Sequence, residues 1–307
     1  MTLRQTARNL TTLGTSSTCV SNTLIGLLLL LAMVVSWSSG FIGYRYAAEQ
    51  GGVYLATFWR FVLAALFLLP FAIRQLRRLS RADVLRQCLM GIFAFAGYIA
   101  PIARSIELGV APGTSSVIAN LLPVTIVLLA GFVPGQRTQG WQWLGLLLCV
   151  AGMLIASASS IEFGSAPAWA YALPLLAVLS IACATLYQKR APLAPMSALT
   201  ALFIQVCAVL PVFAGLALYE GGLRPLAAPG FGLGVIWLTV FSTLGGYGFY
   251  WLCLQRFSMQ RISGALFLTP PVTMFWAWLQ FGDSLPGVAW VGVLLTLIGL
   301  PLLSRRT

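Results

Sequence analysis

Leu-Pro-Val-Thr at residues 122–125 returns as Pro-Pro-Val-Thr at residues 270–273, 148 positions further along the chain. The tripeptide Trp-Leu-Gly at 143–145 is echoed by Trp-Val-Gly at 290–292, at an offset of 147. A single one-residue gap in a loop reconciles the two offsets. The chain therefore contains a unit of about 148 residues that occurs twice.

Long apolar stretches surround both copies of this motif. Of the 307 residues, 59% are hydrophobic and only 8% are charged, whereas roughly 25% are charged in ordinary soluble domains. A helix of about 20 apolar residues crosses a bilayer, and helices or closed barrels alone satisfy their backbone there. We therefore expect an all-α integral membrane protein with ten transmembrane helices. The expected spans cover residues 24–43, 54–73, 87–106, 112–133, 141–158, 168–188, 198–219, 231–254, 262–281 and 287–303.

Each copy of the repeated unit holds five of these spans. Because five is odd, the second copy must enter the membrane upside down relative to the first. We expect a first five-helix repeat over 24–158, a second over 168–303, and a disordered cytoplasmic tail over 1–23. Inverted repeats are typical of transporters that bind their substrate near the midplane, at the repeat interface. Because each five-helix repeat has its inverted partner within the same chain, we also expect that one chain is enough to form the transporter and that the protein is a monomer.

The basic residues fall mainly on one side of this arrangement. With the amino terminus inside, 14 of the 18 Lys and Arg residues lie in cytoplasmic segments, which predicts that both termini are cytoplasmic. The net charge of +12 is thus a topology signal, and we expect no nucleic-acid partner. Four arginines are expected at or near outer ends: Arg45, Arg60, Arg104 and Arg224. Arg104 and Glu107 are spaced to form a surface ion pair, and a contact with a substrate carboxylate is the alternative.

The residue types that catalysis needs are missing or scattered. The chain has no His, its six Cys residues form no C-x-x-C pair, and no Ser or Cys has an evident basic partner. All six acidic residues lie in loops or at span ends, unlike the intramembrane acids of proton-driven pumps. We expect no enzyme activity, no metal site and no cofactor. A membrane-embedded enzyme is the alternative class. A carrier of phosphate-bearing metabolites such as nucleotide sugars is another, although the single Lys argues against it.

The repeated unit resembles the EamA domain of the drug/metabolite transporter superfamily. The residues that carry this resemblance are Trp-Ser-Ser-Gly-Phe at 37–41, Phe-Trp-Arg-Phe at 58–61, Pro123 with Gly145 and Gly152, and Pro271 with Gly292 and Gly299. Within the superfamily the chain looks most like YddG-type exporters of aromatic amino acids, with Gly-Gly-Tyr-Gly-Phe-Tyr-Trp at 245–251 as further support. One departure is Pro-Gly-Gln-Arg at 134–137, where family members often have an acid; Asp283 occupies that place in the second copy.

The resemblance implies a multi-pass transporter of the bacterial inner membrane. It implies the export of small organic metabolites by alternating access, chiefly aromatic or neutral amino acids and also flat organic cations. Aromatic walls with uncharged hydrogen-bonding groups suit such solutes better than sugars or phosphates.

Polar and aromatic residues on corresponding spans of the two repeats form the candidate substrate site. A buried Tyr or Trp needs a partner for its polar atom, and a proline within a span is tolerated where the backbone faces protein or a cavity. We predict contributions from Trp37, Ser38, Tyr98, Asn120 and Pro123 in the first repeat and from Tyr187, Tyr247, Trp251 and Pro271 in the second. For each of them, ordinary core packing is the alternative. In contrast, Trp141, Trp143, Trp169 and Trp290 begin spans and are interpreted as an interfacial belt.

Overall fold

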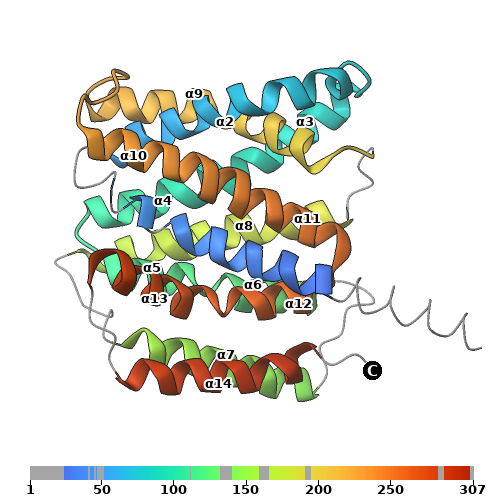
Figure 1. Cartoon of the computed structure of the whole chain (residues 1–307), viewed down its shortest axis with the longest axis vertical. Helices are drawn as coiled ribbons and strands as arrows, with labels where there is room; N and C mark the ends of the chain where they lie inside the picture. Colours follow the sequence, from blue (N-terminus) through green and yellow to red (C-terminus); the bar gives the residue numbers. More distant parts are fainter. Residues whose placement is uncertain are drawn as a thin grey trace, which may run out of the picture.

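The computed structural model describes residues 24–40, 42–44, 46, 52–110, 112–131, 140–158, 166–190, 195–282 and 287–304. These residues are helical apart from turns and connections, and they contain no strand. Figure 1 shows the helices lying side by side along one common direction. The described helices fall, in order, on the ten apolar stretches predicted from the sequence.

Helices of the first half occupy residues 24–158. They are a first helix (Leu24–Tyr44), α2 (Val53–Leu76), α3 (Arg81–Gly91), η1 (Ile92–Ala96), α4 (Gly97–Glu107), α5 (Pro112–Ala119), α6 (Leu122–Gly131) and α7 (Gly140–Ala156). The second half repeats this succession of long, interrupted and broken helices. Its helices are η3 (Ala168–Tyr171), α8 (Ala172–Arg190), α9 (Ala198–Glu220), α10 (Pro229–Trp237), η4 (Leu238–Tyr247), α11 (Gly248–Arg256), α12 (Met259–Leu266), α13 (Thr269–Phe281) and α14 (Gly287–Ser304).

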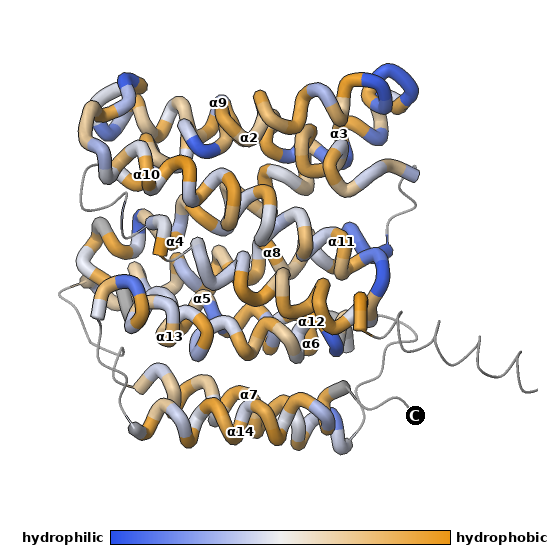
Figure 2. Tube along the Cα trace, in the orientation of Figure 1, coloured by the Kyte–Doolittle hydropathy of each residue, from blue (hydrophilic) through white to orange (hydrophobic). Residues whose placement is uncertain are grey.

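Hydrophobic residues cover the outside of the helices as well as the core. Seven described helices are long and apolar enough to cross a membrane, and three shorter apolar helices accompany them, over Thr114–Leu129, Gly140–Ala156 and Gly287–Leu303. Figure 2 shows the hydrophilic residues gathered at the two ends of the helices. Large side chains such as Leu66, Phe67 and Leu147 stay exposed along the flanks. This surface suits lipid, because water would oppose the exposure of so much apolar area.

The fourth and ninth spans are both broken in the middle. α5 ends at Ala119 and α6 begins at Leu122, while α12 ends at Leu266 and α13 begins at Thr269. In both cases prolines lie just after the break, in the first turn of the new helix. A proline fits that turn because the amide hydrogen it lacks would have no partner there. The prolines Pro123 and Pro271, which the sequence places within the fourth and ninth spans, therefore mark where each span is broken.

The third and eighth spans both contain a π-helical segment. An offset of 148 carries residues 92–96 of η1 onto 240–244, which lie inside η4. A π-helix pairs each amide with the carbonyl five residues back, and it is often found at functional sites. Two carbonyls of η1 accept hydrogen bonds from the second half: Ser180 Oγ donates to Phe93 O at 2.8 Å, and Tyr247 Oη donates to Ala94 O at 3.4 Å. These bonds tie the two halves together at the widened turn.

α7 and α14 form an antiparallel pair at one end of the molecule, as Figure 1 shows. Glycines bring their backbones together: a Cβ added to Gly145 would lie 2.8 Å from Gly299 O, and one added to Gly152 would lie 2.5 Å from Gly292 O. Between these two crossings, the Cys149 thiol donates to Thr296 O at 3.7 Å. In the repeat alignment Cys149 and Thr296 are equivalent positions. A local two-fold axis that relates α7 to α14 therefore passes between these two residues.

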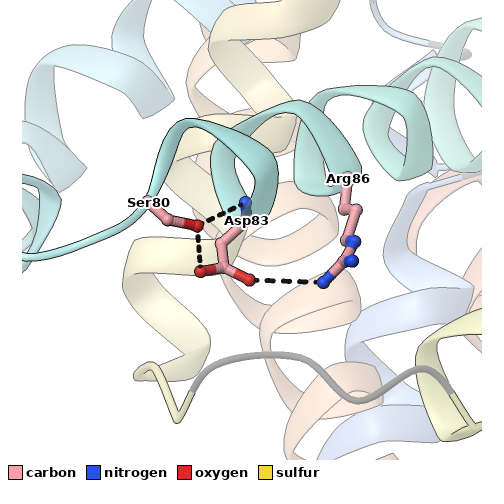
Figure 3. Close-up of polar contacts among 3 residues, drawn as sticks. All are labelled: Ser80, Asp83 and Arg86. Atoms are coloured by element: carbon pink, nitrogen blue, oxygen red, sulfur yellow. Dashed lines mark hydrogen bonds and ion pairs between the residues drawn. The ribbon is translucent and has the colours of Figure 1, made fainter.

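The connection between α2 and α3 is rich in arginine and ends in a well-defined cap. Ser80 Oγ accepts a hydrogen bond from Asp83 N at 3.1 Å and donates to Asp83 Oδ2 at 2.5 Å (Figure 3). The other carboxylate oxygen lies 3.6 Å from Arg86. A carboxylate in the first turn also interacts favourably with the helix dipole. The cap thus begins α3 sharply, directly after the basic residues.

Candidate functional site

Five aromatic side chains meet where the first, third and eighth spans converge. The Trp37 ring centroid lies 5.0 Å from that of Tyr247, 5.2 Å from that of Tyr250 and 6.5 Å from that of Tyr98. Phe95 stacks on Tyr247 with centroids 4.0 Å apart. These tilted geometries are favoured between aromatic rings. We call Trp37, Phe95, Tyr98, Tyr247 and Tyr250 the aromatic cluster.

Small residues allow the first helix to bring Trp37 into this cluster. A Cβ added to Gly245 would lie 2.8 Å from Ser36 Oγ, and one added to Gly40 would lie 2.9 Å from Ser242 Oγ. Glycine and serine therefore face each other where the first helix crosses η4. Such small residues let membrane helices approach closely. The close approach places Trp37 directly over Tyr247.

Hydrogen bonds fix the rings of the two tyrosines from the second half. Tyr250 Oη lies 2.6 Å from Thr185 Oγ1, and Thr185 Oγ1 itself donates to Ile181 O at 2.7 Å. The tyrosine hydroxyl is consequently the donor in its bond to Thr185. Tyr247 donates to the carbonyl of Ala94 in η1. Both hydroxyls are therefore hydrogen-bonded to neighbouring helices. The side chains of Trp37 and Tyr98, in contrast, are only partly buried.

Most of the residues predicted for the site lie in or beside the cluster. Trp37, Tyr98 and Tyr247 belong to it, and Trp251 joins it through Tyr250, with centroids 5.0 Å apart. Trp251 is buried and its indole nitrogen has no hydrogen-bond partner among the described residues.

The remaining predicted residues divide between the broken spans and the outer surface. Ser38 Oγ donates to Thr269 O at 3.1 Å, which ties the first helix to the break in the ninth span. Asn120 and Pro123 lie at the break in the fourth span, and Pro271 follows the break in the ninth. Asn120 and Pro271 are half-buried, and Pro123 is buried.

Tyr187 does not lie with the others. Its side chain is 45% exposed. It follows Thr185 by two residues in α8, which turns it about 200° around the helix, away from the face that holds Tyr250. The structure thus places Tyr187 on the outer surface of the bundle. The prediction from the sequence had put it in the substrate site.

Two members of the cluster were missed from the sequence. Tyr250 follows Tyr247 by three residues and so shares a helix face with it, a spacing that could have been used. Phe95 carries no polar atom and lies in an unbroken apolar run, so nothing in the sequence distinguishes it from lipid-facing neighbours.

Arg60 extends the site away from the aromatic cluster. Its side chain is only 1% exposed and lies two turns into α2, whereas the sequence analysis expected it at or near an outer end. Arg60 Nη1 donates to Tyr44 Oη at 3.0 Å, and Tyr44 Oη lies 2.9 Å from Thr57 Oγ1. The guanidinium carbon lies 4.6 Å from the ring centroid of Phe61. Phe61 in turn packs edge-on against Phe95, with centroids 5.2 Å apart. A continuous set of side chains therefore joins Arg60 to the cluster.

Charged side chains also join helices at the margins of the bundle. Glu220 at the end of α9 accepts hydrogen bonds from the amides of Tyr54 and Leu55, both at 3.1 Å, and so caps α2. Lys189 near the end of α8 donates to two carbonyl oxygens at the end of α11. One is Leu254 O, within the last turn of the helix, and the other is Phe257 O just beyond it, at 2.9 Å. The expected Arg104–Glu107 pair involves the Glu107 side chain, which lies outside the described residues. No group of three metal-binding side chains occurs in the part of the chain that the structure describes.

Comparison with protein families gives two matches along this chain. The EamA-like transporter family matches residues 24–158 and again residues 168–305. This finding confirms the resemblance noted from the sequence. Together with the helical fold, it confirms the expectation of an all-α integral membrane protein.

Curated relatives are similar over most of their length. A probable amino-acid metabolite efflux pump of Escherichia coli is 23% identical, covering 90% of this chain and 93% of the relative. A probable terminal-alkyne amino-acid exporter of Streptantibioticus cattleyicolor is 28% identical, covering 91% and 93%. An S-adenosylmethionine/S-adenosylhomocysteine transporter of Chlamydia trachomatis is 26% identical, covering 81% and 80%. A solved crystal structure, described only as that of a protein, shares the fold with a TM-score of 0.74 at 18% identity, covering 94% of this chain and 99% of that one.

Proposed function

Because this chain belongs to the EamA-like transporter family, we propose that it exports small organic metabolites, chiefly aromatic or neutral amino acids. The observation that carries the proposal is the aromatic cluster, to which both halves of the chain contribute. Trp37, Phe95 and Tyr98 come from the first half, and Tyr247 and Tyr250 come from the second. A site at the interface of two repeats is where transporters of this construction bind their substrates.

In this proposal the two repeats are residues 24–158 and 168–303, inverted relative to one another. Trp37, Tyr98, Tyr247 and Tyr250 form the walls that contact the substrate. The broken spans supply the surrounding polar backbone, with Ser38, Asn120, Pro123, Trp251 and Pro271 nearby. Alternating access arises when one half rocks against the other around this site.

The chemistry of the cluster suits a solute with an apolar ring or chain and a cationic amine. Aromatic faces attract ammonium groups by about 0.5–2 kcal/mol, more strongly where water is excluded. The names of the Escherichia coli and Streptantibioticus relatives support amino acids as the substrate class. The Chlamydia relative supports a second candidate, a nucleoside-linked amino acid that carries a sulfonium cation.

We further propose that the protein is a monomer of the bacterial inner membrane with both termini cytoplasmic and without enzymatic activity. In Figure 1 the start of the first helix, the α2–α3 turn and the end of α14 lie at the same end of the molecule. That end carries the arginines between α2 and α3, which supports its cytoplasmic assignment.

Counterflow in proteoliposomes tests the proposed function. Vesicles loaded with unlabelled solute and diluted into labelled solute should accumulate L-phenylalanine, L-tryptophan or L-leucine through the purified protein. The label should be recovered chemically unchanged, which separates transport from an enzymatic reaction. S-adenosylmethionine provides the arm for the second candidate. Counterflow by none of these solutes, with protein that is folded and inserted, would contradict the proposal.

A further inference from the structure

Arg60 is the most deeply buried charged side chain in the described part of the chain, and two of its three nitrogens have no hydrogen-bond partner there. Nη1 is bonded to Tyr44 Oη, whereas Nε and Nη2 are buried and have no partner among the residues that the structure describes. A guanidinium stays protonated in proteins, so Arg60 keeps its charge. A buried charge without a counter-ion is strongly unfavourable. Among the described residues, nothing supplies the negative charge that would balance Arg60.

The described acidic side chains are engaged elsewhere. Asp83 caps α3 and lies beside Arg86, and Glu220 caps α2. The side chains of the other four acids lie outside the described residues: Glu49, Glu107, Glu162 and Asp283.

The unpaired edge of the guanidinium carries two donors in the arrangement that a carboxylate binds. Tyr44 holds Nη1, and Tyr44 Oη in turn contacts Thr57 Oγ1, which donates to Val53 O at 2.7 Å. This relay fixes the plane of the Arg60 side chain. Nε and Nη2 lie along one edge of that plane, so their two N–H bonds run parallel. Parallel donors of this kind bind both oxygens of one carboxylate.

The position of this edge connects it to the proposed substrate site. Phe61 lies against the guanidinium and packs on Phe95, which stacks on Tyr247. A solute whose ring lies against the aromatic cluster can therefore extend a carboxylate toward Arg60.

We propose that Arg60 binds the carboxylate of the transported solute through Nε and Nη2, so that the transporter selects carboxylate-bearing solutes over the corresponding amines. This inference rests on the proposed function and narrows it. L-phenylalanine should be a substrate, whereas phenethylamine, which has the same ring and amine but no carboxylate, should be a poor one.

The test compares uptake of these two compounds by wild-type protein, Arg60→Lys and Arg60→Gln in proteoliposomes. Arg60→Lys keeps the charge but loses the paired donors, and Arg60→Gln loses both. The ratio of L-phenylalanine to phenethylamine uptake should fall about 10- to 100-fold in Arg60→Gln, as expected for the loss of hydrogen bonds to a charged group. It should fall by a smaller factor in Arg60→Lys. Arg224→Gln removes an exposed arginine and should leave the ratio unchanged.

A ratio that is unchanged in both Arg60 variants would overturn the inference. So would an equal change of the ratio in Glu49→Gln, because Arg60 would then have a resident partner within the chain. Should the wild-type protein transport neither compound, the inference is tested by binding alone, and the proposed function is judged separately by counterflow of the other solutes named above. In that case 3-phenylpropionate should raise the melting temperature of detergent-solubilised wild-type protein, relative to an equal concentration of chloride, but not that of Arg60→Gln. The absence of such a shift in wild-type protein would overturn the carboxylate site.

Discussion

Gly145 of α7 and Gly299 of α14 lie back to back, so that a Cβ on either one would come within 2.8 Å of the other's carbonyl oxygen. The same relationship recurs between Gly152 and Gly292, with the roles of the two repeats exchanged. Because Gly145 is equivalent to Gly292, and Gly152 to Gly299, this helix pair has the internal symmetry of a two-fold dimer.

The first prediction concerns these glycines. Gly152→Ala should lower the free energy of unfolding by about 1–3 kcal/mol, because the added methyl group overlaps the backbone of α14. Gly215→Ala in α9 is the matched control: its Cβ would meet nothing within 4 Å, so the change should be neutral or stabilising. Thermal melting of the two purified variants in detergent measures the difference. Equal melting temperatures would show that α7 and α14 are not in close contact.

Removal of a ring from the aromatic cluster should impair transport. Tyr98→Ala should reduce the counterflow rate at least about tenfold, because it deletes one wall of the proposed site. Trp290→Ala removes a still larger ring that is exposed near the start of α14, and it should leave the rate nearly unchanged. Both rates are measured at matched protein density. If Trp290→Ala abolishes flux while Tyr98→Ala does not, the cluster is not the substrate site.

The hydrogen bond between Tyr250 and Thr185 should contribute measurably to stability. A double-mutant cycle with Tyr250→Phe and Thr185→Val isolates it, and we expect a coupling of about 0.5–1.5 kcal/mol. Chemical unfolding of the wild-type protein, both single variants and the double variant gives the four required values. Additive effects of the two substitutions would mean that the hydroxyls do not interact.

Topology can be tested at the cap of α3. On a background without cysteine, Ser80→Cys should react with a membrane-impermeant maleimide only after the inner face of the membrane is exposed. Cysteine placed in the 159–167 loop should react from the outside in intact cells. Labelling of residue 80 from the outside would reverse the proposed orientation.

Energy coupling follows from where the acids lie. Because all six acidic residues fall in loops or at span ends, we expect a facilitator driven by the substrate gradient and, for charged solutes, by the membrane potential. A membrane potential of 100 mV changes the free energy of moving a monovalent cation across the membrane by about 2.3 kcal/mol. Uphill accumulation driven by a pH gradient, with the potential clamped, would contradict this expectation.

The helices and their breaks could be predicted because they depend on local properties of the chain. Hydropathy over about 20 residues fixes each span, and a proline fixes where a helix can begin again. The face that each residue presents is different, because every face of these helices is apolar. The sequence therefore placed Tyr187 in the site and omitted Tyr250, although Tyr187 is exposed near the end of α8 and Tyr250 is buried. The π-helical turns of η1 and η4 also change the angle between successive side chains along their spans, and no pattern of residues in the sequence predicts these turns.

Arg60 shows the same limit for charge. Its sequence position, near the end of a predicted span, indicated a residue at the membrane surface. The tertiary structure buries it because Tyr44, Phe61 and Thr239 surround it, the last by donating to its backbone carbonyl at 3.2 Å. Two of these three neighbours come from other spans, so their proximity could not be read from the residues beside Arg60.

The matched glycine contacts between α7 and α14 are kept when the two repeats exchange places, so under the alternating access proposed above they are the same whichever side of the membrane the site faces. These contacts can act as a pivot, but they do not favour one orientation of the site over the other. That preference must come from contacts without a counterpart in the other repeat. Glu220 on the start of α2 and Lys189 on the end of α11 are two such contacts, because the positions 148 residues earlier hold Ala72 and Phe41. Each of these two charges therefore acts in one repeat only, and we expect a substitution of either to shift the balance between the two proposed orientations.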